Sequence, residues 1–220
     1  VNSNCSSGSS GLFLARQALL SGQAECVLAV GFEQMTLGAL REHWTDRSTP
    51  LEKFIDVAND VLGDEEGPMA PKLFAAAGRE SVEKYGMTAQ TLAKIPVKAR
   101  RHAEHNPRDV FTDQLTVEEV LSSPAICDPL TRFQCCPPTC GAAAAILCTD
   151  DFALIHGLTR EVRIVAQSLV TDMSSSFAGS AIEAIGADMG RHASTQVYEA
   201  AGIGPEDVDV VELHDCFATA

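Results

Sequence analysis

The sequence of 220 residues contains no apolar run of about 20 residues, the length that a helix needs to cross a bilayer, and no secretory signal segment. Basic side chains are scarce: 16 Lys and Arg stand against 30 Asp and Glu, which gives a formal net charge of −14. This balance argues against a nucleic-acid partner, because phosphate backbones are bound by basic surfaces. Internal repeats and low-complexity tracts are also lacking. What remains is a globular chain whose hydrophobic content of 45% can form a substantial core.

The ends of the sequence predict a fragment, and its cysteines predict a reducing compartment. It begins with Val1 instead of Met and breaks off at Ala220, so we expect a fragment of a longer protein. Eight cysteines in a secreted protein would suggest disulfides. Because Cys26, Cys148 and Cys216 lie in strand-like or core-like segments, we expect a reducing compartment instead.

Short apolar runs alternate with helical patterns along the chain. Continuous apolar runs predict buried strands at 25–33, 141–150, 160–170 and 208–211. Helical spacing of apolar side chains predicts helices at 11–22, 71–85, 88–105 and 187–201. The stretch from 36 to about 139 is more polar and predicts a large, mostly helical insertion. Strands that alternate with helices predict a layered α/β fold.

The first eight residues, VNSNCSSG, place Cys5 at the mouth of the first predicted helix, which we expect to be largely buried and to stop near Gly22. The candidates for its N-cap are Ser6, Ser7, Ser9 and Ser10. A cysteine at that place faces the positive end of the helix dipole and unpaired backbone N–H groups, which favour the thiolate. The small neighbours leave room for a substrate, so Cys5 is a candidate nucleophile; the alternative is a buried structural cysteine.

A second motif, ELHDCF at 212–217, follows the predicted strand at 208–211. His214 and Cys216 are two residues apart and would point to the same side at the carboxyl end of a strand, where open α/β sheets place their ligand sites. A single histidine in such a place is usually structural. Together with Cys5, however, the pair indicates a cysteine nucleophile with acid–base support.

Three segments resemble thiolases, specifically the thiolase portion of sterol carrier protein X: VNSNCSSGSSGLFLARQALLSGQAECVLAVGFEQM, FQCCPPTCGAAAAIL and DVDVVELHDCF. The string HDCF is typical of that subfamily, whereas most thiolases carry Asn-Glu-Ala-Phe. By this resemblance Cys5 matches the acyl-accepting nucleophile, and His214 replaces the Asn that helps to shape an oxyanion hole. Cys216 matches the second acid/base group. The Gly-His-Pro loop of the family, with its catalytic histidine, does not occur here, so we expect these 220 residues alone to be inactive.

The resemblance implies a five-layered α-β-α-β-α fold built from two similar halves. Residues 1–157 would be the thiolase N-terminal half with a loop domain inserted at about 41–140, and 158–220 would begin the C-terminal half. The implied activity is that of an acyl-CoA C-acyltransferase of the 3-ketoacyl-CoA thiolase type, in fatty acid β-oxidation or related lipid metabolism. Its substrates would be 3-oxoacyl-CoA and coenzyme A, without a further cofactor. A homodimer is implied, in the cytoplasm if bacterial and in the peroxisome if eukaryotic.

Two other functions stay open. One is an aldolase-like carbon–carbon lyase on the same fold, which Cys5 argues against because a lyase needs no acyl-accepting thiol. The other is a non-catalytic lipid-handling or scaffold subunit, which the candidate residues Cys5, His214 and Cys216 argue against.

Two further clusters have simpler interpretations beside the functional ones. Lys98, Arg100 and Arg101 form the one basic cluster and could hold coenzyme A phosphates, although a solvated helix face is the simpler interpretation. The segment CCPPTC at 135–140 lacks the second spaced ligand pair of a zinc site, so we expect no metal but a buried loop beside the active site. Its last residue, Cys140, stands where thiolases often carry Asp, which predicts the loss of a supporting hydrogen bond.

Overall fold

The computed structural model describes residues 1–36, 44, 46–63, 67–159 and 162–220. The chain divides into two compact units. The first, here called the sheet unit, comprises Val1–Ala39, Pro138–Thr171 and Arg191–Asp209. The second, the helical unit, comprises Leu40–Pro137, Asp172–Gly190 and Val210–Ala220. Cys5 belongs to the sheet unit, whereas His214 and Cys216 belong to the helical unit, so each is described within its own unit.

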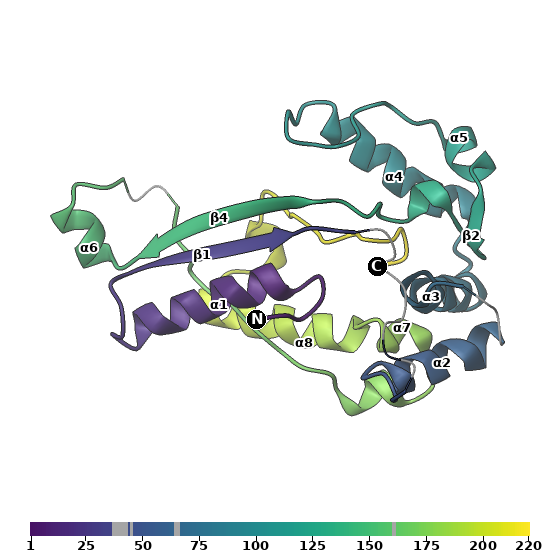
Figure 1. The fold of residues 1–220 in the computed structure, drawn as a ribbon, viewed down its shortest axis with the longest axis horizontal. Coiled ribbons are helices and arrows are strands. Elements are labelled where there is room, and N and C mark those ends of the chain that lie inside the picture. Colours follow the sequence, from purple (N-terminus) through teal and green to yellow (C-terminus); the bar gives the residue numbers. More distant parts are fainter. Residues whose placement is uncertain (37–43, 45, 64–66, 160–161) are drawn as a thin grey trace. The chain divides into compact units, whose positions relative to one another are not determined.

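The sheet unit is built on two long antiparallel strands with helix α1 alongside (Figure 1). Its elements are α1 (Ser7–Leu20), β1 (Cys26–Glu33), β4 (Gly141–Cys148), α6 (Asp150–Ile155) and most of α8 (Ala187–Ala201). The register of the strands sets Cys26 opposite Cys148 and Glu33 opposite Gly141. Helix α1 ends before Gly22, whose φ of 73° is the left-handed conformation that glycine adopts without strain. The predictions of the first helix, its stop, both strands and the helix at 187–201 are therefore confirmed.

The sheet is less buried than its apolar strands predict. A continuous apolar run is typical of a strand that is covered on both faces, but α1 packs beside β1 on one face only. On the other face Leu28, Val30 and Phe32 of β1 are exposed, as is Ile146 of β4. No residue of β1 or β4 is buried, and in β4 residues of both faces are exposed from Gly141 to Ile146. The prediction of buried strands is thus wrong, and Cys26 is exposed too. Helix α1 itself buries only Ser10 and Ala15, so the prediction that it is largely buried is also wrong.

Two predicted strands are not formed. The described part of 160–170, from residue 162 onward, and the run at 208–211 have no strand structure. A strand needs a neighbour for its N–H and C=O groups, and neither run has such a partner in the described parts of the chain. Val162 and Val210 accordingly remain 91% and 80% exposed, which contradicts the prediction of buried strands here.

The core of the helical unit is formed by α2 and α3 together with residues of β2, β3, α7 and the C-terminal segment. Its helices and strands are α2 (Glu52–Leu62), α3 (Met69–Tyr85), α4 (Ala89–Ala103), α5 (Val117–Ser122), β2 (Ala125–Cys127), β3 (Leu130–Thr131) and α7 (Ala181–Ala184). The buried core residues are Val57, Ala58, Leu62, Ala75, Ala76, Ala77, Cys127, Leu130, Ala181 and Phe217. The predicted helices at 71–85 and 88–105 are confirmed as α3 and α4, while α2 and α5 were not predicted. Thr116 and Glu119 begin α5 with a reciprocal capping box, a local signal that the periodicity does not contain.

Candidate active site

Cys5 is presented by a tight turn directly before α1. The turn is closed by a hydrogen bond from the Ser6 amide to the Ser3 carbonyl at 3.1 Å. Asn4, inside the turn, has a φ of 51°, a left-handed conformation that asparagine tolerates better than most residues. The Ser7 hydroxyl accepts from the Ser3 amide and donates to the Asn4 carbonyl, each at 2.7 Å. Backbone and hydroxyl bonds together therefore fix the position of Cys5.

The local surroundings of Cys5 suit a reacting thiol. Cys5 is exposed, so the alternative of a buried structural cysteine is wrong for this chain. It lies one residue before Ser6, the N-cap, whose hydroxyl bonds back to the Ser3 carbonyl at 2.8 Å instead of capping the helix. The Ser7 amide donates to the Asn4 carbonyl at 3.2 Å, so the N–H groups of Gly8 and Ser9, which receive no hydroxyl cap from Ser6, are the natural donors for an anion at this end of the helix. A Cβ atom at residue 8 would meet no other atom within 4 Å, so there is free space beside the start of the helix.

In the helical unit, the segment that carries Cys216 pairs with the cysteine-rich segment. The Cys136 amide donates to the Cys216 carbonyl at 2.7 Å, and the Ala218 amide donates to the Gln134 carbonyl at 2.9 Å. These two bonds flank an antiparallel bridge. Cys216 is half-buried and His214 is exposed. Cys216 is therefore positioned by this backbone pairing and not, as the sequence predicts, by the end of a strand.

Phe217 anchors the same segment to α3. Its side chain is 6% exposed, and its ring stacks on that of Phe74 with a centroid distance of 4.5 Å and an interplanar angle of 19°. The Thr219 hydroxyl donates to the Phe74 carbonyl at 2.8 Å. Cys216 therefore sits next to a residue that is held in the core.

Gly78 of α3 lies close against Thr219 and Pro129. A Cβ atom at residue 78 would lie 2.8 Å from Cγ2 of Thr219 and 3.1 Å from Cγ of Pro129. Both distances are too short, so a side chain would push one of these neighbours away. The sequence alone gives no signal for Gly78, because only the folded chain brings residue 219 to it.

We expect Gly78→Ala to lower the free energy of unfolding of the complete protein by about 1–3 kcal/mol, the usual cost of overpacking. Gly190→Ala is the matched control, because residue 190 is also helical and has open space around it. That variant should be neutral or slightly more stable, since alanine favours a helix over glycine by about 1 kcal/mol. Chemical denaturation measures both. Equal stability of the two variants would contradict the close packing at Gly78.

The cysteine-rich segment is partly beside Cys216 and mostly exposed. Cys135 is half-buried, and burial raises the pKa of its thiol to about 11, with the charges of Cys136 and Cys127 adding to the rise. Cys136 and Cys140 are exposed, so the prediction of a buried loop is wrong for them. Among the described residues no group of three or more His, Cys, Asp or Glu side chains is arranged to hold a metal ion. That the segment binds no metal remains a prediction.

Cys140 makes two hydrogen bonds to the backbone of Met35. Its sulfur accepts from the Met35 amide at 3.2 Å and donates to the Met35 carbonyl at 3.8 Å. A thiol is a weak donor and acceptor, so these contacts are weaker than those of a carboxylate. The expected loss of the hydrogen bond that Asp makes in other thiolases stays a prediction.

The basic cluster on α4 separates into two kinds of residue. The Arg100 guanidinium lies 4.9 Å from the centre of the Phe111 ring and donates to the Asp113 carbonyl at 3.5 Å. Lys98 and Arg101 are exposed and three residues apart, which places them on one face of the helix. Arg100 thus holds the loop after α4, while the other two cations face solvent.

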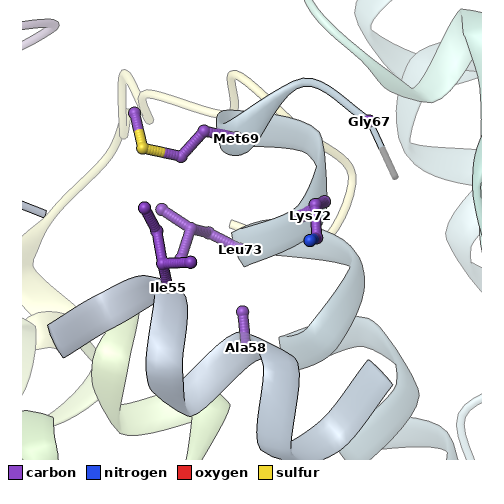
Figure 2. A pocket seen from close by; sticks show the side chains of 6 residues that line it. All are labelled: Ile55, Ala58, Gly67, Met69, Lys72 and Leu73. Atoms are coloured by element: carbon purple, nitrogen blue, oxygen red, sulfur yellow. The ribbon is translucent and has the colours of Figure 1, made fainter. Parts of the chain in front are cut away.

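A small pocket lies between α2 and α3 (Figure 2). It has a volume of about 140 Å³ and is lined by Ile55, Ala58, Gly67, Met69, Lys72 and Leu73. The Lys72 ammonium donates to the Asn59 side-chain oxygen at 3.1 Å. None of the candidate site residues lines this pocket, and its size suits a few atoms only.

Comparison with known proteins identifies the family. The profile described as Thiolase, N-terminal domain matches residues 1–151. The chain belongs to the thiolase family. This thiolase-family chain is 48% identical to sterol carrier protein 2 of Rattus norvegicus, with 100% of the chain and 40% of that protein aligned. It is 31% identical to an acetyl-CoA acetyltransferase of Methanothermobacter thermautotrophicus, covering 99% of the chain and 54% of that enzyme.

The fold agrees with that assignment. The solved structure of an Ltp2-ChsH2(DUF35) aldolase matches with a TM-score of 0.69 and 20% identity, over 96% of this thiolase-family chain and 53% of that chain. At this identity the match concerns the fold alone. The expected thiolase fold is therefore confirmed, and the chain spans two-fifths to a little over half the length of its matched relatives. No helix in the described parts of the chain is long and apolar enough to cross a membrane.

Proposed function

We propose that the protein is an acyl-CoA C-acyltransferase that cleaves 3-oxoacyl-CoA with coenzyme A, and that Cys5 carries the acyl group between the two steps. The observation that carries this proposal is the exposed Cys5 thiol at the N-terminus of α1. Exposure leaves the sulfur open to a substrate, and a cysteine sulfur is the kind of nucleophile that can carry an acyl group as a covalent intermediate. The name of the acetyl-CoA acetyltransferase relative supports the same class of reaction.

In the proposed reaction, the Cys5 sulfur attacks the 3-oxo carbon of the substrate. The bond between this carbon and the neighbouring carbon breaks, and the released carbanion takes a proton. His214 donates a hydrogen bond to the oxygen that gains negative charge, and Cys216 supplies the proton. The thiol of coenzyme A then attacks the acyl-enzyme and frees Cys5. Donors aimed at such an oxygen lower the barrier because the charge develops only in the transition state.

Lys98 and Arg101 are the proposed contacts for the phosphates of coenzyme A, because they are exposed cations on one helix face in an otherwise acidic chain. Arg100, already engaged by Phe111 and Asp113, is a weaker candidate than its two neighbours.

We expect the double substitution of Lys98 and Arg101 by glutamate to raise the KM for coenzyme A, with kcat within a few-fold of the native value. Attraction to phosphate acts on ground state and transition state alike, so it affects binding more than chemistry. Lys53→Glu together with Lys84→Glu is the matched control at exposed lysines elsewhere in the helical unit. If this helix face is only solvated and has no binding role, both double variants should have the same KM for coenzyme A. If it binds the phosphates, rising salt should weaken the binding of coenzyme A to the native protein but not to the Lys98 and Arg101 double variant.

The direct test of the function is thiolytic cleavage by the complete protein. Incubation of 3-oxoacyl-CoA with coenzyme A should release acetyl-CoA and a shortened acyl-CoA. A carbon–carbon lyase on this fold would instead cleave its substrate without needing free coenzyme A. Failure of the products to depend on free coenzyme A would therefore favour the lyase, a function suggested by the name of the matched aldolase, which shares the fold alone.

A lipid-handling subunit is the other alternative, favoured by the name sterol carrier protein 2 of a relative. Neither acylation of Cys5 nor turnover is expected in that case.

The rest of the proposal follows the family. Residues 1–157 form the thiolase N-terminal half with the loop domain at about 41–140, and 158–220 begin the second half. We propose a homodimer that uses no cofactor besides its coenzyme A substrates. It would act in lipid metabolism, in the cytoplasm of a bacterium or the peroxisome of a eukaryote. Because the sequence lacks the Gly-His-Pro loop, these 220 residues alone should be inactive.

A further inference from the structure

Two cysteines face each other across the backbone pairing of the helical unit. The bridge sets Cys135 opposite Phe217, so the next residues outward, Cys136 and Cys216, are also directly opposed. The hydrogen bond from the Cys136 amide to the Cys216 carbonyl, at 2.7 Å, joins this opposed pair. Opposed residues of an antiparallel pair project their side chains from the same face. The two thiols therefore start from adjacent backbone positions on one side of the pairing.

The spacing of an antiparallel pair matches that of a disulfide. Opposed Cα atoms in such pairs are about 4.5–5.5 Å apart. Disulfide-linked cysteines have Cα atoms about 4.4–6.8 Å apart. The cysteines at 136 and 216 can thus be bridged without moving the backbone far, although both are thiols in the structure.

We propose that Cys136 and Cys216 form a reversible disulfide when the protein meets a peroxide. Cys136 is exposed and Cys216 is half-buried, so the oxidant reaches Cys136 first. The Cys136 thiolate attacks one oxygen of the peroxide, which leaves a sulfenic acid on Cys136 and releases hydroxide. The Cys216 sulfur then displaces the hydroxyl group, and the sulfur–sulfur bond forms. In total, two thiols and one hydrogen peroxide give one disulfide and two waters.

The neighbouring Cys135 does not compete for this reaction. Consecutive residues of an extended segment point to opposite faces, so Cys135 faces away from Cys216. Its sulfur donates to the Thr131 carbonyl at 3.5 Å. Burial raises the pKa of this thiol to about 11, which keeps the attacking thiolate rare at neutral pH.

The consequence for activity rests on the proposed function of Cys216. A disulfide removes the proton that this thiol would supply, so carbon–carbon bond cleavage stops while the fold persists. A thiol reductant restores it, because an exposed disulfide is readily attacked. The segment would thus make the enzyme sensitive to the redox state of its surroundings.

The test is disulfide mapping on the complete protein after treatment with hydrogen peroxide and blocking of the remaining thiols with N-ethylmaleimide. A Cys5→Ser background removes any bridge to the proposed nucleophile. Trypsin cuts after Arg132, Arg160 and Arg191, so the two cysteines fall in different peptides. The expected product is a pair of peptides joined by a disulfide. Its mass is that of the two thiol peptides together less two hydrogen atoms, and dithiothreitol should reduce it to the separate peptides. It should persist in Cys135→Ser and vanish in Cys136→Ser.

Two outcomes would overturn the inference: a cross-link that survives Cys136→Ser, or oxidation of Cys136 to sulfinic acid with Cys216 still blocked by N-ethylmaleimide. The mapping needs no turnover, so its result does not depend on the proposed function.

If the disulfide forms but Cys216→Ala turns over normally, the proposed role of Cys216 is wrong and the disulfide is still supported. Where Cys216 is required for turnover, peroxide should cause a loss of activity that dithiothreitol reverses in Cys135→Ser. In Cys136→Ser the activity that dithiothreitol restores after peroxide treatment should be several-fold less than in Cys135→Ser.

Discussion

Cys5→Ala in the complete protein is expected to abolish acyl transfer, with a loss of turnover on the order of 10⁴-fold or more, as is typical when a nucleophile is removed. Cys5 is exposed, and the turn before α1 is held by backbone groups and by the Ser7 hydroxyl, so the fold should survive the change. Incubation of the native protein with an acyl-CoA should leave an acyl group on Cys5, which intact-mass and peptide analysis detect. The variant should carry none.

Two controls separate a nucleophile from an ordinary exposed thiol. Cys26→Ala changes an exposed cysteine of the same unit and should leave acylation and turnover unchanged. Iodoacetamide should label Cys5 faster than the buried Cys127 or the half-buried Cys135. Because burial raises the pKa of Cys135 to about 11, its labelling should increase as the pH rises toward that value. Acylation at another cysteine, or uniform labelling of all of them, would contradict the assignment of Cys5.

Features that depend on neighbouring residues in the sequence were predicted well. Helix α1 and its end near Gly22 follow from apolar spacing and a glycine that adopts a positive φ. The strands β1 and β4 follow from continuous apolar runs. Cys5 was selected because a cysteine before a helix has a physical reason to react, and that reason is local.

Features that depend on contacts between distant segments were not predicted. The runs at 160–170 and 208–211 have strand-like composition, but composition does not supply the hydrogen-bonding partner that a strand needs. The pairing of Cys136 with Cys216 joins residues 80 positions apart in the sequence. The close approach of Thr219 to Gly78 is equally non-local. His214 and Cys216 were chosen from their spacing and from the family resemblance, whereas what holds Cys216 in place appears only in the folded chain.

Loss of His214 and loss of Cys216 should slow different steps of the reaction. If His214 donates to the developing oxyanion, His214→Ala should lower kcat by about 10²–10³-fold and leave KM within a few-fold, because the interaction strengthens only in the transition state. His214→Asn should recover part of this loss, since an amide can donate a hydrogen bond. His105→Ala, at another exposed histidine of the same unit, is the control and should have no effect.

Cys216→Ala should leave the first nucleophilic attack possible but remove the proton that carbon–carbon bond cleavage or formation requires. With a simple acyl-CoA, which acylates Cys5 without breaking a carbon–carbon bond, the variant should still form the acyl-enzyme. With 3-oxoacyl-CoA and coenzyme A its turnover should stall. Rapid-quench measurement of the acyl-enzyme beside steady-state turnover separates the two steps. The change is conservative in volume, and Phe217 still anchors the segment through its stack on Phe74, so misfolding does not explain such a split. If Cys216→Ala turns over at the native rate, the proton comes from another group, and the role assigned to this cysteine is wrong.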